Sequence, residues 1–228
     1  MTQLALVTGA SRGIGAAIAH ALVPTHQVLL GGRDAGALAV VAGQAPGARP
    51  WAVDLTDPAA LAAATAEITE LDVLVHSAGV AEMGTVEEAD ADTWRKNFEV
   101  NVVAVAELTR LLLPALRAAK GHVVVINSGA GLTVRPGWGP YAASKFAARA
   151  FADVLRAEEG PHSVRVTSIF PGRTDTGMQQ EIVASEGGDY DTARYLRPAS
   201  VAAAVLAAVS ASPDAHLTEV ILRPAVSS

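Results

Sequence analysis

The sequence predicts an α/β protein built on a doubly wound parallel sheet, and two observations lead to this prediction. Short apolar, β-branched runs alternate with longer Ala-rich helical patterns from one end of the 228 residues to the other. The short runs are continuously hydrophobic, which is typical of strands buried on both faces of a parallel sheet. This alternation implies right-handed crossovers that place helices on both faces. The seven strand candidates are Leu4–Thr8, Gln27–Gly31, Arg49–Val53, Asp72–His76, His122–Asn127, Val164–Phe170 and Glu219–Leu222.

The helix candidates between these strands begin and end at residues with suitable capping chemistry. Asp57 precedes Pro58, which is typical of an N-cap followed by proline at the first helical position. Gly121 and Gly160 stand where helices should end. Pro114 lies inside an amphipathic pattern, so we expect a kink or a break there. The helix candidates are Ile14–Leu22, Ala35–Ala42, Pro58–Ile68, Asp92–Lys120, Tyr141–Glu159 and Val201–Val209.

No linker, repeat or low-complexity segment divides the chain, so we expect residues 1–228 to form a single domain. Only residues 173–198 have no clear place in the alternation, because this stretch is polar, acidic and contains glycine. Ligands of open α/β sheets bind beyond the carboxyl ends of the strands. A long connection after the strand that ends at Phe170 is therefore a candidate substrate lid.

The composition narrows the class of function. A net charge of −6 without a cluster of Lys and Arg argues against a nucleic-acid partner. The absence of Cys excludes disulfides, thiolate zinc sites and a Cys nucleophile, and the six His show no ligand spacing, so we expect no metal. The longest Ala/Val/Leu-rich run, Val201–Val209, is far shorter than the roughly 20 residues that span a bilayer. No basic leader precedes the first strand, so we expect a cytoplasmic protein without a membrane partner.

The first strand leads directly into a glycine-rich turn, Thr8-Gly9-Ala10-Ser11-Arg12-Gly13-Ile14-Gly15, and then into a helix. Glycines allow a tight turn and a close approach of the backbone to a pyrophosphate, whose charge is held at the helix N-terminus. The spacing is TGxxxGxG and differs from the GxGxxG of the general dinucleotide fingerprint. A tight turn that binds nothing is the alternative, but a position after the first strand of a βαβ unit favours a Rossmann-type dinucleotide site.

The end of the second strand predicts the choice of cofactor. NAD sites usually place a carboxylate there, which accepts a hydrogen bond from the ribose 2′-hydroxyl. Here that position is Gly32, while Arg33 and Arg12 are placed to pair with a 2′-phosphate, so we expect NADP(H) to be preferred over NAD(H). Two alternatives stay open. The arginines could be solvated surface residues, and Asp34 could either take the carboxylate role or cap the next helix.

Tyr141 and Lys145 stand four residues apart on a helical pattern, so they share one helix face. A phenol has a pKa of about 10 in water, too high for efficient acid–base chemistry at neutral pH, and a neighbouring ammonium group is expected to lower that pKa. YxxxK alone is a common accident of amphipathic helices. Ser128, however, ends a strand on the expected ligand side of the sheet, where its hydroxyl could hydrogen-bond a substrate oxygen beside the phenol.

With these residues the chain resembles the short-chain dehydrogenase/reductase family, and the resemblance covers essentially its whole length. The matching motifs are the TGxxxGxG turn, Asp54, His76-Ser77-Ala78-Gly79, Asn101, Ser128, Tyr141-Ala-Ala-Ser-Lys145 and Pro171-Gly172. Each motif is weak alone, but the full set in this order is highly specific. The resemblance implies a seven-stranded parallel sheet with helices on both faces. It also implies an NADP(H)-dependent enzyme that acts on CH–OH groups, with a small carbonyl or alcohol as substrate.

The resemblance also implies a role for each matching residue. Tyr141 would protonate the carbonyl oxygen in reduction or remove the hydroxyl proton in oxidation, and Ser128 would orient that oxygen. Lys145 would hold the nicotinamide ribose and lower the pKa of Tyr141, while Asn101 would fix a water that links Lys145 to solvent. The implied cofactor contacts are Gly9, Ser11, Arg12, Gly13, Ile14, Gly15, Arg33, Asp54, Leu55, Ser77, Ala78, Gly79, Asn101, Tyr141, Lys145, Pro171, Gly172, Thr174 and Thr176.

Two departures from the family pattern stand out. His76 and Ser77 replace the Asn-Asn that the family commonly has, which puts local hydrogen bonds in doubt, and we interpret His76 as structural. Thr174 stands where an apolar residue is more usual, with Thr176 present downstream. The ending Glu219–Pro224 and the compact length resemble small NADP-dependent reductases of 3-hydroxy acids, serine-like substrates or diverse carbonyls, which leaves the substrate open.

Two other functions stay in view. One is a catalytically silent dinucleotide-binding sensor of the same fold, which would not need the complete set of Asn101, Ser128, Tyr141 and Lys145. The other is a sugar-nucleotide epimerase or dehydratase. Proteins of that class have a turn similar to TGxxGxxG and a substantial C-terminal substrate domain, whereas this chain has TGxxxGxG and only a short tail after Leu222. NADPH oxidation with a panel of carbonyls would separate the enzyme from the sensor.

The sequence also suggests which residues line the substrate pocket and how the chain assembles. Proximity in sequence to Ser128 and Pro171-Gly172 identifies Ala130, Leu132, Val134, Trp138, Met178 and Gln179 as pocket candidates. The helical patterns 101–120 and 141–159 have Ala and Leu on several sides. By analogy with the family, we expect these helices to pair across a two-fold axis in a homodimer or homotetramer.

Overall fold

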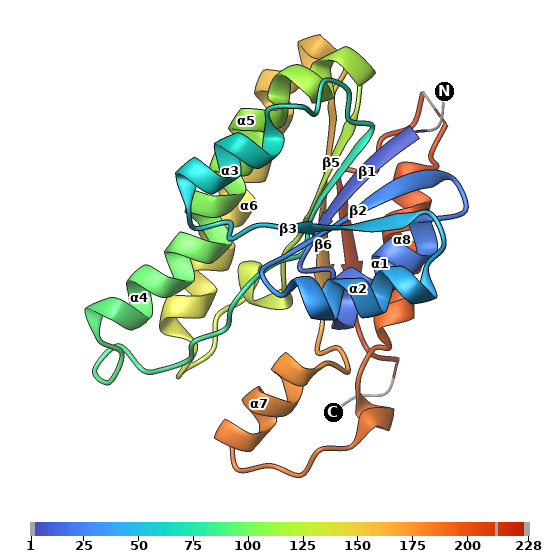
Figure 1. Ribbon diagram of the computed structural model, residues 1–228. Helices are drawn as coiled ribbons and strands as arrows, with labels where there is room; N and C mark the ends of the chain where they lie inside the picture. The colour runs from blue at the N-terminus through green and yellow to red at the C-terminus, as the bar shows by residue number, and fades with distance from the viewer. Residues whose placement is uncertain (1–2, 213, 226–228) are drawn as a thin grey trace.

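Seven parallel strands form one sheet in the order β3-β2-β1-β4-β5-β6-β7 in the computed structural model, which describes residues 3–212 and 214–225 (Figure 1). Two βαβ halves diverge from β1 and β4 at its centre, which is the predicted doubly wound, Rossmann-type arrangement. All six strand pairs are parallel. The strands are β1 Gln3–Thr8, β2 His26–Gly32, β3 Ala48–Ala52, β4 Val73–His76, β5 His122–Ile126, β6 Arg165–Pro171 and β7 Glu219–Leu222.

Helices cover both faces of this sheet. Helices α1, α2 and α8 lie on one face, and α3, α5 and α6 lie on the other (Figure 1). The α-helices are α1 Gly13–Leu22, α2 Ala35–Gln44, α3 Pro58–Thr65, α4 Ala91–Phe98, α5 Ala104–Ala119, α6 Gly139–Glu159, α7 Gly177–Ser185 and α8 Pro198–Val209. Three 3₁₀ turns span Gly129–Gly131 (η2), Gly160–His162 (η3) and Thr192–Arg194 (η4).

Two apolar layers explain why the strand sequences are hydrophobic without alternation. Successive strand residues point to opposite faces, so Leu6 packs with Leu112 of α5 while Val7 packs with Ile18 of α1. Helices shield both faces of the sheet from water, so each position in a central strand needs an apolar side chain. The interpretation of the continuous hydrophobic runs is therefore confirmed for the inner strands, whereas the edge strands β3 and β7 are partly or largely exposed.

Capping contacts set several helix boundaries. The carboxylate of Asp57 accepts hydrogen bonds from the N–H groups of Ala59 and Ala60 at 3.0 and 3.1 Å, as its position before Pro58 predicts. Asp34 accepts from the N–H of Ala37 at 3.0 Å and is the N-cap of α2. Of the two roles that were open for Asp34, the structure therefore assigns the cap.

We predicted a break or a kink at Pro114. A break is wrong, because α5 continues through this residue without interruption. The irregular part of the long helical pattern lies further toward the N-terminus, where a π-helical turn, η1 (Glu99–Val103), separates α4 from α5. Such turns add a residue to the helix and frequently occur at functional sites. Asn101, one of the predicted site residues, lies inside this turn.

Helix α7 is a further departure from the sequence analysis. It lies in the first half of residues 173–198, for which the sequence pattern indicated no regular element. Figure 1 places α7 beyond the end of the sheet, away from the two helical layers. The segment thus lies over the carboxyl ends of the strands, as a lid would. None of the described helices is long and apolar enough to cross a membrane.

Candidate active site

The glycine-rich turn packs directly against the loop that follows β4. Gly9 has φ +66°, and a Cβ atom at this position would lie 2.8 Å from both N and Cα of Ala78. The hydroxyl of Thr8 accepts hydrogen bonds from the N–H groups of Ser77 and Ala78, both at 3.1 Å. Only glycine therefore fits at Gly9, and Thr8, which the sequence analysis did not single out, joins the two loops at the carboxyl edge of the sheet.

A groove of about 310 Å³ runs along this turn, and we call it the cofactor groove. It brings together residues from the ends of β1, β2, β3 and β4. The predicted cofactor residues that line it are Gly9, Ser11, Arg12, Gly13, Ile14, Gly15, Arg33, Asp54, Leu55, Ser77, Ala78, Gly79 and Thr176. Lys96 of α4 also lines it and was not predicted from the sequence.

Three cations, Arg12, Arg33 and Lys96, and the carboxylate of Asp54 line this groove. Arg33 and Arg12 both line it, and Nη1 of Arg12 lies 3.7 Å from where a Cβ of Gly177 would stand, at the start of α7. The carboxylate of Asp54 accepts hydrogen bonds from the N–H and hydroxyl of Thr56, which lower the pKa of Asp54, and the charge of Arg33 lowers this pKa further. The part of the groove beside the ends of β2 and β3 thus offers both cationic and acceptor groups.

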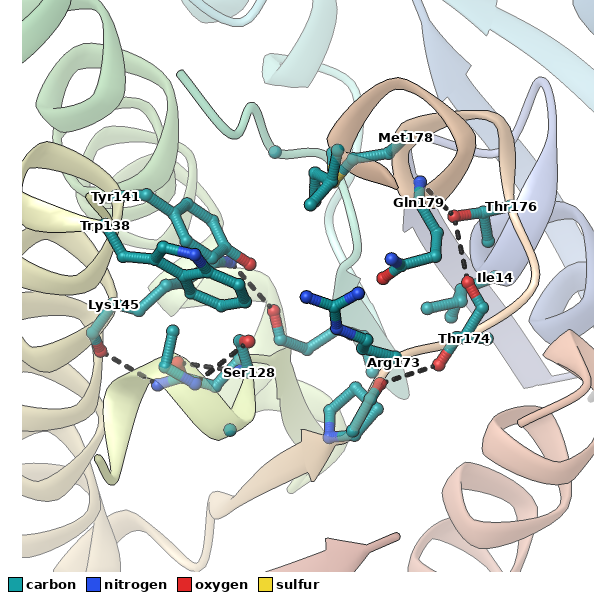
Figure 2. A pocket seen from close by; sticks show the side chains of 18 of the residues that line it. Ile14, Ser128, Trp138, Tyr141, Lys145, Arg173, Thr174, Thr176, Met178 and Gln179 are labelled. Carbon is teal, nitrogen blue, oxygen red and sulfur yellow. Dashed lines mark hydrogen bonds between the residues drawn. The ribbon is translucent and has the colours of Figure 1, made fainter. Parts of the chain in front are cut away.

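A second hollow of about 290 Å³, the catalytic cavity, adjoins the cofactor groove. It is lined by Ser128, Tyr141 and Lys145, and by the predicted residues Pro171, Gly172 and Thr174. Six residues line both hollows: Ile14, Ser77, Gly79, Val80, Thr176 and Met178. Figure 2 shows Tyr141, Lys145 and Ser128 on one wall of the cavity, with Met178, Gln179 and Thr176 on the opposite wall.

Tyr141 and Lys145 share the buried face of α6, as their spacing predicts. Each is only 7% exposed, and the ammonium group of Lys145 donates to the carbonyl of Ile126 at 3.3 Å. Burial raises the pKa of Tyr141, while a hydrogen bond with Ser128 acts in the opposite direction. Burial also lowers the pKa of Lys145 to about 8. The expected lowering of the Tyr141 pKa is therefore not met, because burial of the phenol raises this pKa more than the hydrogen bond with Ser128 lowers it.

Asn101 does not line either hollow, although the sequence analysis assigned it to both the catalytic and the cofactor sets. Its amide oxygen accepts a hydrogen bond from the N–H of Val80, and its amide nitrogen donates one to the carbonyl of Val80, both at 3.0 Å. It also donates to the hydroxyl of Ser144 at 2.9 Å, and that hydroxyl donates to the carbonyl of Tyr141 at 2.7 Å. Asn101 therefore fixes the β4 loop relative to the helix that holds Tyr141.

Asn127 is a site residue that the sequence analysis missed. Its amide oxygen accepts from the N–H of Ser128 at 2.9 Å, and its amide nitrogen donates to the carbonyl of Lys145 at 3.1 Å. The side chain thus connects the end of β5 to α6 and sets the position of Ser128 relative to Lys145. A polar residue at the end of a buried strand, directly before Ser128, was the available signal.

His76 lies outside the site. Its ring is 2% exposed and lines neither hollow, and Nε2 lies 2.8 Å from the hydroxyl of Thr109 in α5. Burial lowers the pKa of His76 to about 3, so the ring is neutral at physiological pH. This placement agrees with the structural role that we assigned to His76 from the sequence.

The structure separates the six pocket candidates into two groups. Ala130, Trp138, Met178 and Gln179 line the catalytic cavity. Leu132 and Val134 do not, and Val134 is 71% exposed. Thr133 and Arg135, which alternate with these two residues, line the cavity although they were not predicted. Proximity in sequence to Ser128 therefore identified the right segment but not which of its side chains line the cavity.

The sheet topology, the glycine turn and the adjoining hollows define a Rossmann-type nucleotide-binding protein. Comparison with known proteins narrows this class. The model of the short chain dehydrogenase family matches residues 3–187, and the chain belongs to this family of oxidoreductases.

Individual relatives agree with this assignment. The chain is 37% identical to the Bos taurus dehydrogenase/reductase SDR family member 7B, covering 90% of this chain and 69% of the relative. It is 31% identical to the Bos taurus SDR family member 11, covering 97% and 96%. Among solved structures, an alcohol dehydrogenase from Thermococcus sibiricus complexed with 5-hydroxy-NADP superimposes with a TM-score of 0.88 at 26% identity, covering 98% and 97%. A metagenomic short-chain oxidoreductase in complex with NADP has a TM-score of 0.84 at 31% identity, covering 99% and 98%.

Proposed function

We propose that this protein transfers hydride between NADP(H) and a small carbonyl or alcohol substrate, with Tyr141 as the acid–base group. One observation above all supports the proposal. The side chains of Tyr141, Lys145 and Ser128 line a cavity that shares six wall residues with the cofactor groove. A substrate in the cavity would therefore lie against the part of the groove closest to the catalytic residues.

The groove fits a dinucleotide on structural grounds. A Cβ atom at Gly9 would collide with the backbone of Ala78. Because Gly9 has no side chain, the turn can pack closely there and leave its backbone beside the first turn of α1 accessible to a diphosphate. Gly9, Gly13 and Gly15 would take the diphosphate, Asp54 and Leu55 the adenine, and Lys145 the nicotinamide ribose. The nicotinamide, when bound, would supply or accept the hydride.

Tyr141 would give a proton to the substrate oxygen in the direction of reduction. Because burial raises its pKa, the phenol is protonated at neutral pH, which suits a general acid. Ser128 lines the same cavity and would hold the carbonyl oxygen beside the phenol. The ammonium group of Lys145 would stabilise the phenolate that remains after proton transfer.

We further propose that NADP(H) is preferred over NAD(H). Gly32 offers no carboxylate to a ribose 2′-hydroxyl, and the carboxylate of Asp34 is used as the cap of α2. Arg33 and Arg12 line the groove and would pair with a 2′-phosphate. Related structures that contain NADP or an NADP derivative are consistent with this choice.

Residues 173–198 would act as the substrate lid, because Met178 and Gln179 of α7 line the catalytic cavity. For assembly we propose a homodimer or homotetramer. On α6, Phe146 is 39% exposed and Val154 is 56% exposed, two turns apart on the helix that family members use for pairing.

The experiment that tests the function follows NADPH absorbance with a panel of ketones, 3-oxo esters, quinones and 3-hydroxy acids. We expect turnover with at least one carbonyl, and its loss in Tyr141→Phe. A protein that binds NADPH tightly and turns over no member of the panel would instead support the catalytically silent sensor.

A further inference from the structure

The charge lining the catalytic cavity is one-sided, although the protein has a net charge of −6. Besides Lys145, the cavity is lined by Arg135, Arg173, Arg194 and Arg223. No Asp or Glu from the described ranges lines it. A hollow surrounded by charges of one sign attracts ligands of the opposite sign, and the planar fork of arginine matches a carboxylate. The cavity therefore favours an anionic ligand.

The four arginines differ in what they already bind. Arg173 makes an ion pair with Glu186, with Nη2 at 2.5 and 2.7 Å from the two carboxylate oxygens, so its charge is balanced. Arg223 donates to the carbonyl groups of Phe170 and Leu222. Arg135 and Arg194 make no ion pair with any residue that the structure describes. These two guanidinium groups are available for a ligand.

Arg135 and Tyr141 both lie beside the ring of Trp138. The guanidinium group of Arg135 is 5.7 Å from the centroid of this ring, and the ring is 6.2 Å from the ring of Tyr141 in an edge-on arrangement. The cation and the proposed proton donor therefore line the same part of the catalytic cavity.

Gln179 provides an independent observation. Thr176-Gly177-Met178-Gln179 has the sequence of a capping box, in which the Gln side chain normally returns to the first residue of the motif. Only half of the box forms: the hydroxyl of Thr176 accepts from the N–H of Gln179 at 3.2 Å, while the Gln179 side chain makes no such return bond.

The amide of Gln179 is instead directed toward the catalytic cavity. The residue is 6% exposed, its Nε2 has no hydrogen-bond partner among the residues that the structure describes, and it lines the catalytic cavity but not the cofactor groove. Figure 2 shows its amide on the wall opposite Tyr141. A buried donor without a partner is costly, so it indicates a missing acceptor on the substrate side.

We propose that the substrate carries a carboxylate, bound by Arg135, Arg194 and the amide of Gln179, so that the enzyme interconverts a small oxo acid and the corresponding hydroxy acid. This inference rests on the proposed function. In reduction the carbonyl carbon gains the hydride and its oxygen gains the proton of Tyr141. The carboxylate is unchanged, and one NADPH and one proton are consumed for each hydroxy acid formed.

The test compares linear 2-, 3- and 4-oxo acids with their methyl esters, which differ only in charge. With the wild-type enzyme we expect kcat/KM for the best acid to exceed that of its ester at least tenfold. Arg135→Gln and Arg194→Gln should each raise KM for the acid about tenfold and leave the ester nearly unchanged. Arg49→Gln is the matched control, because it removes the same charge from a residue that is exposed on β3 and lines neither hollow.

Binding is measured separately from turnover by titration calorimetry of the Tyr141→Phe variant loaded with NADPH. The acid should bind at least tenfold more tightly than the ester. Equal binding, or no binding of either, would overturn the inference, as would tighter binding of a phosphate-bearing ketone than of every oxo acid. Selective binding of the acid to a protein that turns over no carbonyl would support the anion site and refute the proposed function.

Gln179→Leu separates a ligand-binding role from a structural one. It removes a buried donor that has no partner, so the thermal midpoint of the ligand-free protein should rise while affinity for the acid falls severalfold. A fall in the thermal midpoint together with unchanged acid affinity would show that Gln179 only supports the fold, and would remove it from the site.

Discussion

The ammonium group of Lys145 lies 5.9 Å from the centroid of the Tyr141 ring, and both side chains are buried on the same face of α6. Burial shifts the two pKa values toward the neutral forms, raising that of Tyr141 and lowering that of Lys145 to about 8. Tyr141 is therefore a protonated phenol at neutral pH, and Lys145 loses its proton more readily than usual. The first two predictions test the two sides of this pair.

Replacing Tyr141 with Phe should lower kcat by about 10²- to 10⁴-fold, because general acid–base groups typically contribute that much. Affinity for NADPH, measured by fluorescence titration, should change little, since the phenol faces the substrate cavity. A variant that keeps more than about a tenth of wild-type turnover would show that another group transfers the proton.

Replacing Lys145 with Met should change how stability depends on pH. Because burial lowers the pKa of Lys145 to about 8, the unfolded chain binds more protons between pH 8 and about 10.5. The free energy of unfolding of the wild type should therefore rise with pH across this window, and below it the buried charge is unfavourable. Lys145→Met should be more stable by up to roughly 3 kcal/mol at pH 7, since one pKa unit corresponds to about 1.4 kcal/mol.

Urea unfolding at pH 7 and at pH 9.5 measures this difference. Lys120→Met is the control, because Lys120 is exposed at the end of α5 and should show no such gain. A Lys145→Met protein whose stability relative to the wild type is the same at both pH values would contradict the lowered pKa. Its turnover should fall in any case, because the variant lacks the charge beside Tyr141.

Cofactor preference should depend on Arg33. A charge-assisted hydrogen bond contributes about 1.5–3 kcal/mol, and 1.4 kcal/mol is a factor of about ten. Contacts from Arg33 and Arg12, weakened by solvent, should favour NADPH over NADH by roughly 10- to 1000-fold in kcat/KM. Arg33→Ala should lower kcat/KM for NADPH about tenfold or more and hardly change that for NADH, which has no 2′-phosphate.

Gly32→Asp tests the same preference from the other side. The new carboxylate should repel the phosphate and accept from a 2′-hydroxyl, which shifts preference toward NADH. A Cβ at Gly32 would lie 3.3 Å from Cδ2 of Leu38, so the Leu38 side chain must shift slightly. The thermal midpoint of the variant should therefore be measured together with its kinetics. Equal use of NADH and NADPH by the wild type would show that Arg33 is only a surface residue.

The lid should be protected by ligands. Residues 173–198 are largely exposed between Gly187 and Arg194 and are connected to the domain through few buried side chains. Hydrogen exchange should be fast in this segment without ligand and slower with NADP(H) and substrate. Strand β5 (His122–Ile126), which is fully buried, is the internal control. Identical exchange of the segment in both states would identify it as a fixed wall.

Assembly should depend on the exposed face of α6. Light scattering at micromolar concentration should give a mass at least twice 23.3 kDa. Phe146→Glu should shift the protein toward the monomer, because a charge would be buried at the helix pair. Val40→Glu is the control, since Val40 is 63% exposed on α2, away from α6. A wild-type mass near 23.3 kDa would disprove the assembly.

Local sequence chemistry determined the strands, most of the helices and the glycine turn. The Asp57 cap before Pro58 and the positive φ of Gly9 are set by backbone preferences and by immediate neighbours, and the continuous apolar runs can be identified in the sequence directly. The four-residue spacing of Tyr141 and Lys145 likewise placed them on one helix face. These are short-range effects, and a sequence displays them directly. The collision with Ala78 that excludes a side chain at Gly9 depends on the fold.

Only the tertiary structure decided the features that depend on contacts between distant segments. The bonds of Asn101 to Val80 and Ser144, and of Asn127 to Lys145, join residues that no local pattern connects. The pKa of Tyr141 is raised because the fold buries its side chain deeply. The positive charge of Lys145, four residues away, could not predict this direction. Only the fold brings Arg135, Arg194 and Gln179, which come from separate elements, to one hollow, and the anionic ligand that we infer depends on this arrangement. Burial and long-range packing act on the folded chain as a whole, so they become visible only when the fold is complete.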